Sequence, residues 1–196
     1  MKKLILFAAI LFAGVSVVKA EGEEKTGKTG TVNFQLNLHA FQSIEIGGGD
    51  EGTIDSETGL FNDAVVLNYN TVERYESGVS RTINDHIKIK TAGGFAIKVS
   101  STDNLENDIN GGELVSMSTI ALTAQEKGLH KSDIENGLTL SSEPKTFISS
   151  GSGLGKEISY NVTYTGADKN AYGKYVDATG ATRELTTTVT YEIVPG

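Results

Sequence analysis

The stretch TVNFQLNLH, residues 31–39, constrains the fold of this chain more than any other part of the sequence. Its apolar and polar residues alternate one by one. Successive side chains of a β-strand point to opposite faces, so this pattern predicts a strand with one fully apolar face. A slip of one residue would turn that face outward, so the alternation also fixes the register of the strand. The apolar face consists of Val32, Phe34, Leu36 and Leu38.

Short β-type runs, separated by Gly, Asn, Asp and Ser, follow this strand to the end of the chain. Many short strands with turn signals between them predict an all-β fold, an immunoglobulin-like antiparallel β-sandwich. The pair Gly93-Gly94 predicts a hairpin turn, and a helical turn is expected only within 122–137. Residues 31–196 are predicted to form a single domain, because no linker divides them. The expected strands after the first are 43–46, 64–70, 86–91, 95–101, 114–123, 138–142, 145–150, 157–165 and 184–194.

Residues 1–20 have the layout of a secretory signal peptide. Two lysines precede an uncharged apolar run, and small residues stand at Val18 and Ala20, the two positions that a signal peptidase reads. The apolar run is shorter than the roughly 20 residues that a membrane-spanning helix needs. We therefore expect cleavage after Ala20 and an exported mature protein without a membrane-spanning segment.

Composition excludes some classes of partner. The chain carries 17 basic and 25 acidic residues, and the predicted signal peptide holds three lysines and no acid, so the mature charge is 14 − 25 = −11. Such an acidic protein is not expected to bind nucleic acid. The chain has no cysteine, so an exported fold must be stabilised by core burial and by partner contacts instead of disulfides.

Residues 21–30, EGEEKTGKTG, contain no apolar side chain and are predicted to be a disordered leader. Within them, Gly22–Thr29 has the letters of the phosphate-binding loop GxxxxGK[ST]. That loop works between a strand and a helix whose N-terminus receives the phosphate, whereas here a strand follows it. We therefore expect no nucleotide binding. The similar run Gly151–Lys156, GSGLGK, lies between β-type runs and is expected to be a hairpin loop.

The sequence gives no catalytic motif. The histidines His39, His86 and His130 lie in separate segments without cysteine or HExxH, and His39 and His86 are expected at solvated or edge positions. We predict neither an enzyme nor a cofactor. The weak candidates for calcium are Glu106, Asp108 and Asn110, at alternate positions before a glycine, but the acid expected twelve residues from the loop start is replaced by Met117. Further acidic residues lie in the glycine-rich stretch 47–59.

Two interpretations of the first strand remain open from the pattern alone. Residues 31–39 either pair inside their own sandwich or complete the sheet of a neighbouring subunit by strand addition. Each of their apolar side chains would contribute about 1.5–3 kcal/mol when fully buried.

The run AVVLNYNTVERYESGVSRTINDHIKIKTAGGFAIKVSSTDNL, residues 64–105, resembles the central part of alpha-class (coli surface antigen type) fimbrial major subunits. The runs TVERYESGV, NDHIKIKTAGGFAIKVSS and LTLSSEPKTFISSGSGLGKEISYNVTY also resemble a group of uncharacterised secreted proteins of Gram-negative bacteria. The resemblance implies an immunoglobulin-like sandwich exported to the periplasm and assembled on the cell surface by a chaperone and an outer-membrane usher. It also implies that Val32, Phe34, Leu36 and Leu38 form the donor strand.

The sequence therefore predicts a structural subunit of a fimbria or pilus-like polymer, joined to other copies or related subunits by N-terminal strand addition. The alternative is a monomeric periplasmic or surface-bound β-sandwich module for binding or adhesion.

Overall fold

The structure, a computed structural model, describes residues 35–36, 41–47, 65–102, 106–107, 115–153, 155–176 and 184–196. The chain divides into two compact units, Met1–Asn37 and Leu38–Gly196, and the second holds all the secondary structure described below. Its elements, in chain order, are β1 (Gln42–Ile46), α1 (Val72–Ser77), β2 (Ser80–Thr91), β3 (Phe95–Ser101), β4 (Glu106–Asn107), the 3₁₀ turn η1 (Met117–Thr119), β5 (Ile120–Lys127), β6 (Asp133–Ile134), β7 (Leu138–Thr139), β8 (Lys145–Ser150), β9 (Glu157–Gly166), the 3₁₀ turn η2 (Gly173–Tyr175), β10 (Leu185–Thr186) and β11 (Val189–Pro195).

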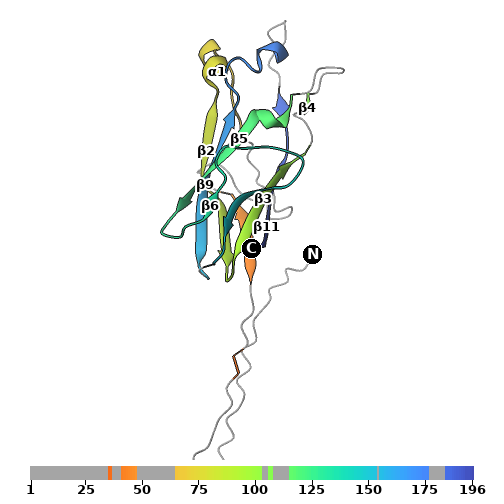
Figure 1. Cartoon of the computed structure of the whole chain (residues 1–196). Coiled ribbons are helices and arrows are strands. Elements are labelled where there is room, and N and C mark those ends of the chain that lie inside the picture. Colours follow the sequence, from red (N-terminus) through yellow and green to blue (C-terminus); the bar gives the residue numbers. More distant parts are fainter. Residues whose placement is uncertain are drawn as a thin grey trace, which may run out of the picture. The chain divides into compact units, whose positions relative to one another are not determined.

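The described strands form two antiparallel sheets that face each other (Figure 1). One has the order β1-β2-β9-β5-β7 and the other the order β11-β3-β8-β6, while β10 and β4 pair as a short ribbon. Every strand pair is antiparallel. The predicted all-β antiparallel sandwich is therefore confirmed.

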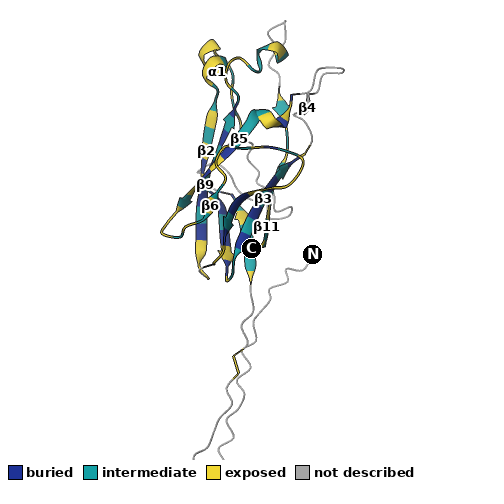
Figure 2. Cartoon of the chain, in the orientation of Figure 1, coloured by how far each residue is buried: buried dark blue, intermediate teal, exposed yellow. Residues whose placement is uncertain are grey.

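Alternation along the strands builds the core between the sheets. In β3 and β9, every second residue is buried, and the buried residues lie along the strands while α1 is exposed (Figure 2). Burying each large apolar side chain contributes about 1.5–3 kcal/mol, which makes this layer the main source of stability in a chain without disulfides. The fully buried apolar side chains with the largest volumes are Tyr160, Phe95, Phe147, Ile87, Ile89, Ile97, Leu122 and Ile148.

The hairpin predicted at Gly93-Gly94 is wrong. β2 belongs to the five-stranded sheet and β3 to the four-stranded sheet, so the chain crosses between the sheets here. A tight two-residue hairpin of type I′ needs positive φ at both central residues, and neither glycine has one. The hairpin predicted at Gly151–Lys156 is wrong for the same topological reason, because β8 and β9 also lie in different sheets.

The two crossings pack against each other at one end of the sandwich. Gly155 N–H donates to the carbonyl of Thr91 at 2.9 Å. A Cβ added to Gly153 would clash with that same carbonyl, and one added to Gly94 would lie 3.1 Å from the carbonyls of Ser150 and Gly151. Gly94 and Gly153 are required because two backbones approach each other closely here, whereas Gly155 has a φ of 63°, which favours glycine.

Two other predictions of secondary structure are wrong. Residues 65–70 are not in a strand, and the helix α1 follows them. The Thr71 side chain caps this helix by accepting from Arg74 N–H, and Gly78, with φ of 77°, ends it. Within 122–137, β5 continues to Lys127 where a helical turn was expected. The pairing of β5 with β9 outweighs the helix propensity of its Ala, Gln, Glu and Lys residues.

Candidate functional site

Of the four residues predicted to bind a partner strand, the structure describes one. Val32, Phe34 and Leu38 lie outside the described residues. The Leu36 side chain is 67% exposed and belongs to the unit Met1–Asn37, not to the unit that holds the sandwich. Single exposed leucines are ordinary, but this leucine is one of four apolar residues on the same predicted face.

Among the described residues, the C-terminal strand β11 pairs along one edge only. It stands at the end of the four-stranded sheet, next to β3. Its inward residues Val189, Tyr191 and Ile193 pack against the core but remain half-buried. Proline has no N–H to donate to the hydrogen-bond ladder, so within a sheet it is found mainly on edge strands. Pro195 is the last residue of β11.

The neighbouring edge strand has the same incomplete burial. β1 ends the five-stranded sheet and contacts β11 across the side of the sandwich. Its inward residues Ile44 and Ile46 are half-buried as well. The two edge strands therefore leave the core less covered here than at the centre of the sheets, where Tyr160 and Ile97 are fully buried.

His86, which was expected at an edge or solvated position, is buried, with 2% of its surface exposed. Its Nδ1 lies 2.7 Å from the carbonyl oxygen of Gly47, just after β1, and its Nε2 lies 2.9 Å from the hydroxyl of Tyr164. That hydroxyl lies 2.8 Å from the hydroxyl of Tyr191 on β11. The network therefore connects the two edge strands through the interior of the sandwich.

The direction of these hydrogen bonds follows from their acceptors. A carbonyl only accepts, so His86 Nδ1 carries the proton and donates to Gly47. Burial lowers the pKa of His86, against the opposing effect of this hydrogen bond, so the ring is neutral and Nε2 accepts from Tyr164. Burial also raises the pKa of Tyr164 to about 12, which keeps its hydroxyl protonated as this donor. Tyr191 then donates to Tyr164 and completes the chain.

A β-bulge turns His86 inward. Between the paired positions Ile83↔Val162 and Ile87↔Tyr160, β2 contains more residues than β9. Asp85 takes up the excess with a φ of 52°, a conformation that Asp tolerates better than most residues. Its carboxylate accepts from Lys127 Nζ at 2.8 Å and from Ser159 at 2.6 Å. Hydrogen bonding by Lys127 and then by Ser159 lowers the pKa of Asp85.

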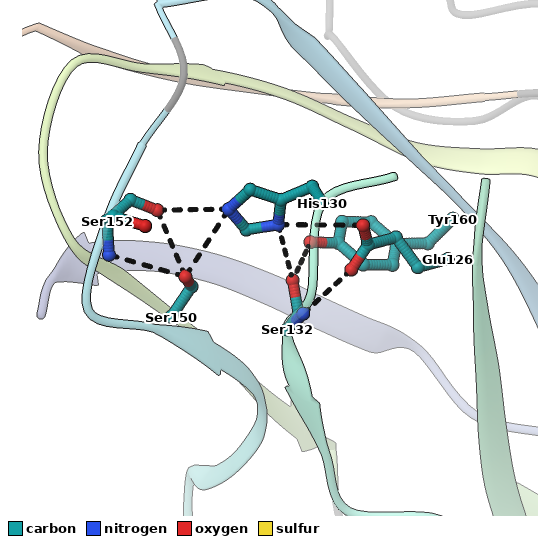
Figure 3. Close-up of polar contacts among 6 residues, drawn as sticks. All are labelled: Glu126, His130, Ser132, Ser150, Ser152 and Tyr160. Carbon is teal, nitrogen blue, oxygen red and sulfur yellow. Dashed lines mark hydrogen bonds and ion pairs between the residues drawn. The ribbon is translucent and has the colours of Figure 1, made fainter. Parts of the chain in front are cut away.

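A second histidine with a buried side chain, His130, lies in a cluster of polar side chains (Figure 3). His130 follows the turn after β5, and its side chain is 6% exposed. Its Nδ1 lies 3.5 Å from Oε1 of Glu126 and 3.2 Å from Oγ of Ser132. On the other side of the ring, Nε2 lies 3.2 Å from the carbonyl of Ser152 and 3.4 Å from Oγ of Ser150.

The cluster brings together a carboxylate, an imidazole and a serine hydroxyl, the components of a hydrolytic triad, so its geometry has to be tested against that chemistry. Ser150 Oγ donates to the carbonyl of Ser152 at 3.0 Å, and that carbonyl also faces His130 Nε2. A carbonyl requires a donor, so Nε2 carries a proton. A general base needs its lone pair directed at the serine hydroxyl. This arrangement therefore does not activate Ser150 as a nucleophile.

The calcium candidates are not brought together as a site by the described structure. The backbone of Glu106 pairs with Thr186 in the β4–β10 ribbon. Asp108 and Asn110 lie outside the described residues, as do His39 and the acidic residues of 48–59. Within the described ranges, no group of three or more His, Cys, Asp or Glu side chains is placed to hold a metal ion. The phosphate-loop match Gly22–Thr29 also lies outside them.

Among the described helices, none is both long and apolar enough to cross a membrane. The sequence matches no protein-family model, and comparison with curated proteins finds no relative of it. The function therefore has to be inferred from the sheet edges, the buried polar groups and the sequence patterns.

The sequence interpretation missed both buried histidines, for different reasons. His86 follows Asn84-Asp85 inside an otherwise alternating run, and two residues that tolerate positive φ were the available signal of a bulge. His130 had no such signal. Its distant partners, Ser150 at the end of β8 and Ser152 just after it, are brought to this turn by the fold alone.

Proposed function

We propose that this chain is an exported structural subunit of a fimbria or pilus-like surface polymer, in which the N-terminal strand of one copy adds to the sandwich of the next. The observation that carries the proposal is that β11, in the part of the chain that the structure describes, pairs along one edge only and has a half-buried row of Val189, Tyr191 and Ile193.

An added strand would complete the burial of this row. Val32–Leu38 is as long as β11 and alternates in the same way, so its four apolar side chains can cover the row while its main chain extends the sheet. Main-chain hydrogen bonds give such strand addition its affinity, and the alternate side chains give it specificity. Four side chains at about 1.5–3 kcal/mol each form a strong non-covalent link.

The proposal also implies partners during export. The signal-peptide pattern of residues 1–20 supports passage to the periplasm. An uncovered edge strand with apolar neighbours is an aggregation hazard, so a periplasmic chaperone would cover β11 until the next subunit replaces it. The resemblance to fimbrial subunits supports such a chaperone and an outer-membrane usher. The final location would be the surface of a Gram-negative cell.

Removal of the donor segment tests this proposal. The mature chain, with and without residues 21–40, is run unboiled and boiled on a denaturing gel. We expect a ladder of oligomers for the unboiled full-length chain, its collapse on boiling, and no ladder for the truncated chain. A full-length chain that is a stable monomer, and that merely unfolds when truncated, would contradict strand exchange.

A second candidate function, a monomeric binding module, is favoured by a tyrosine cluster near α1. The ring of Tyr69 lies 5.4 Å from that of Tyr75 and 4.8 Å from that of Tyr172, and Lys174 lies over the ring of Tyr175. The Tyr69 hydroxyl donates to the carbonyl of Ala167 at 2.8 Å, which fixes the ring. Rigid tyrosines on the loops of a β-sandwich are effective binding anchors. In this case, surface attachment of the monomer would be lost in Tyr75→Ala and retained after removal of residues 21–40.

A further inference from the structure

A line of hydrogen-bonded side chains crosses the interior of the sandwich from the end of β1 to β11. His86 on β2 donates from Nδ1 to the carbonyl of Gly47 at 2.7 Å, and its Nε2 lies 2.9 Å from the hydroxyl of Tyr164 on β9. That hydroxyl lies 2.8 Å from the hydroxyl of Tyr191 on β11. Each of the two edge strands is therefore tied to the core through a different nitrogen of the same imidazole.

The two ends of this line respond differently to a proton on His86. Nδ1 carries a proton in the neutral ring and in the imidazolium alike, so its hydrogen bond to Gly47 is retained. Gly47 is also held by its own N–H, which donates to the backbone carbonyl of His86 at 2.9 Å. Nε2, in contrast, changes from an acceptor to a donor, so the hydroxyl of Tyr164 can no longer donate to it. The acid-sensitive end of the line is therefore the end at β11.

The change at Nε2 is passed on to Tyr191. Tyr164 would accept from the imidazolium and turn its own proton toward Tyr191, whose hydroxyl proton then needs a new acceptor. Both tyrosines stay protonated, because burial raises the pKa of Tyr164 to about 12 and also raises that of Tyr191. Among the described residues, β11 pairs only with β3, so movement of this edge strand is the cheapest way to bring the hydroxyl of Tyr191 to water.

We propose that His86 is an acid-operated release for β11, in which a proton on Nε2 reverses the Tyr164–Tyr191 hydrogen bond and loosens β11 while β1 stays held. A cation is costly at a position that is 2% exposed, so the protonated ring favours an arrangement that admits water. In the described part of the chain, the titratable groups against the ring are the hydroxyls of Tyr164 and Tyr191. On the side of β1 the ring meets the Gly47 carbonyl.

The release acts below the ordinary pKa of histidine. Burial lowers the pKa of His86 in the closed structure, and opening at β11 would return it toward about 6.5. The open form therefore binds the proton more tightly, and its population rises as the pH falls below that value. The inference concerns a single chain and does not rest on strand exchange. Where copies do exchange strands, the edge that loosens in acid is the edge to which a strand adds.

Hydrogen exchange, followed by mass spectrometry on the monomer fraction of the full mature protein, tests the inference. Protection of the β11 amides is compared with that of the β1 amides at pH 7 and pH 5, after correction for the intrinsic exchange rates. We expect protection of β11 relative to β1 to fall by about three- to thirtyfold. β1 serves as the internal control, since it is also an edge strand and keeps its bond to His86 in acid.

Variants separate this network from other effects of acid. His86→Gln takes up no proton at this position and should show the same relative protection of β11 at both pH values. Tyr191→Phe lacks the hydroxyl at the β11 end, so it should lower β11 protection already at pH 7 and reduce the further fall in acid. Tyr160→Phe removes a buried hydroxyl that is bonded to Ser132 outside this line, and it should behave as the wild type.

Three results would overturn the inference. An equal fall in protection of β1 and β11 would mean that acid weakens the whole fold, and the same relative fall in His86→Gln would assign the effect to another group. If His86→Gln does not fold, Tyr191→Phe decides. Protection of β11 equal to that of the wild type at pH 7 would show that the hydroxyl of Tyr191 does not hold this strand.

Discussion

At the scale of the residue, a backbone carbonyl beside each of two buried histidines determines which ring nitrogen carries a proton. Gly47 holds the proton of His86 on Nδ1, and Ser152 holds that of His130 on Nε2. The remaining nitrogen of His86 accepts from a tyrosine and serves the core, whereas that of His130 faces a carboxylate. The two histidines therefore differ in the group that the second ring nitrogen faces, a tyrosine hydroxyl for His86 and a carboxylate for His130.

The buried, neutral state of His86 predicts a loss of stability in acid. Its pKa is lowered in the folded protein, so the unfolded chain binds the proton first, near the ordinary value of about 6.5. The contribution of His86 is complete above that pH and is lost as the pH falls toward the lower folded value. Protonation would also make Nε2 a donor and so oppose the direction of the hydrogen bonds from Tyr164 and Tyr191.

Urea unfolding at pH 7 and pH 5 measures this effect. The wild-type protein should lose more unfolding free energy over this range than His86→Gln, with a difference of at most about 1.4 kcal/mol per pH unit. Every other titratable group is the same in the two proteins, so the comparison isolates His86. Equal losses in the two proteins would show that His86 is not buried and neutral as described.

At the scale of the element, the sandwich depends on two glycine-containing crossings that pack together. A Cβ at Gly153 would meet the carbonyls of Thr91 and Gly93, the latter at 2.6 Å, and neither backbone group can move away cheaply. Gly151 lies in the same crossing, but an added Cβ there would have no neighbour within 4 Å. The two positions form a matched pair for substitution.

Gly153→Ala should lower the free energy of unfolding by about 1–3 kcal/mol, the usual cost of overpacking. Gly151→Ala should change it by less than about 0.5 kcal/mol, because the added methyl group enters open space. Urea denaturation of both variants measures the difference. Similar stabilities for the two would mean that the crossings do not pack as described.

The strands themselves were predictable, but their partners were not. Phe95–Ser101 and Lys145–Ser150 are predicted residue for residue, because alternation and bounding turn residues are local signals. Whether Gly93-Gly94 makes a hairpin or a crossing depends on the contact with Gly151 and Gly153, far away in the sequence. The cluster around His130 depends on the same long-range packing, so no spacing in the sequence indicates it.

At the scale of the whole molecule, the central claim is that a sandwich with an open edge is completed by another copy of the chain. β11 and β1 leave a half-buried apolar row at one side, and the segment 32–38 carries a matching row. The surface of β11 that faces away from the core is exposed at Thr190 and Glu192. An added strand would place its polar face, with Gln35 and Asn37, beside these residues.

The chain has no cysteine, so single cysteines introduced on the two strands report this contact directly. Mature Gln35→Cys or Asn37→Cys protein is mixed with Thr190→Cys or Glu192→Cys protein under mild oxidation, and Glu143→Cys replaces the β11 variant as the control. We expect disulfide-linked dimers between the two strand variants, well above the control, with one pair favoured by the register. Cross-linking no greater than the control, or a Gln35→Cys/Thr190→Cys double variant that closes its disulfide within a dilute monomer, would contradict strand addition between copies.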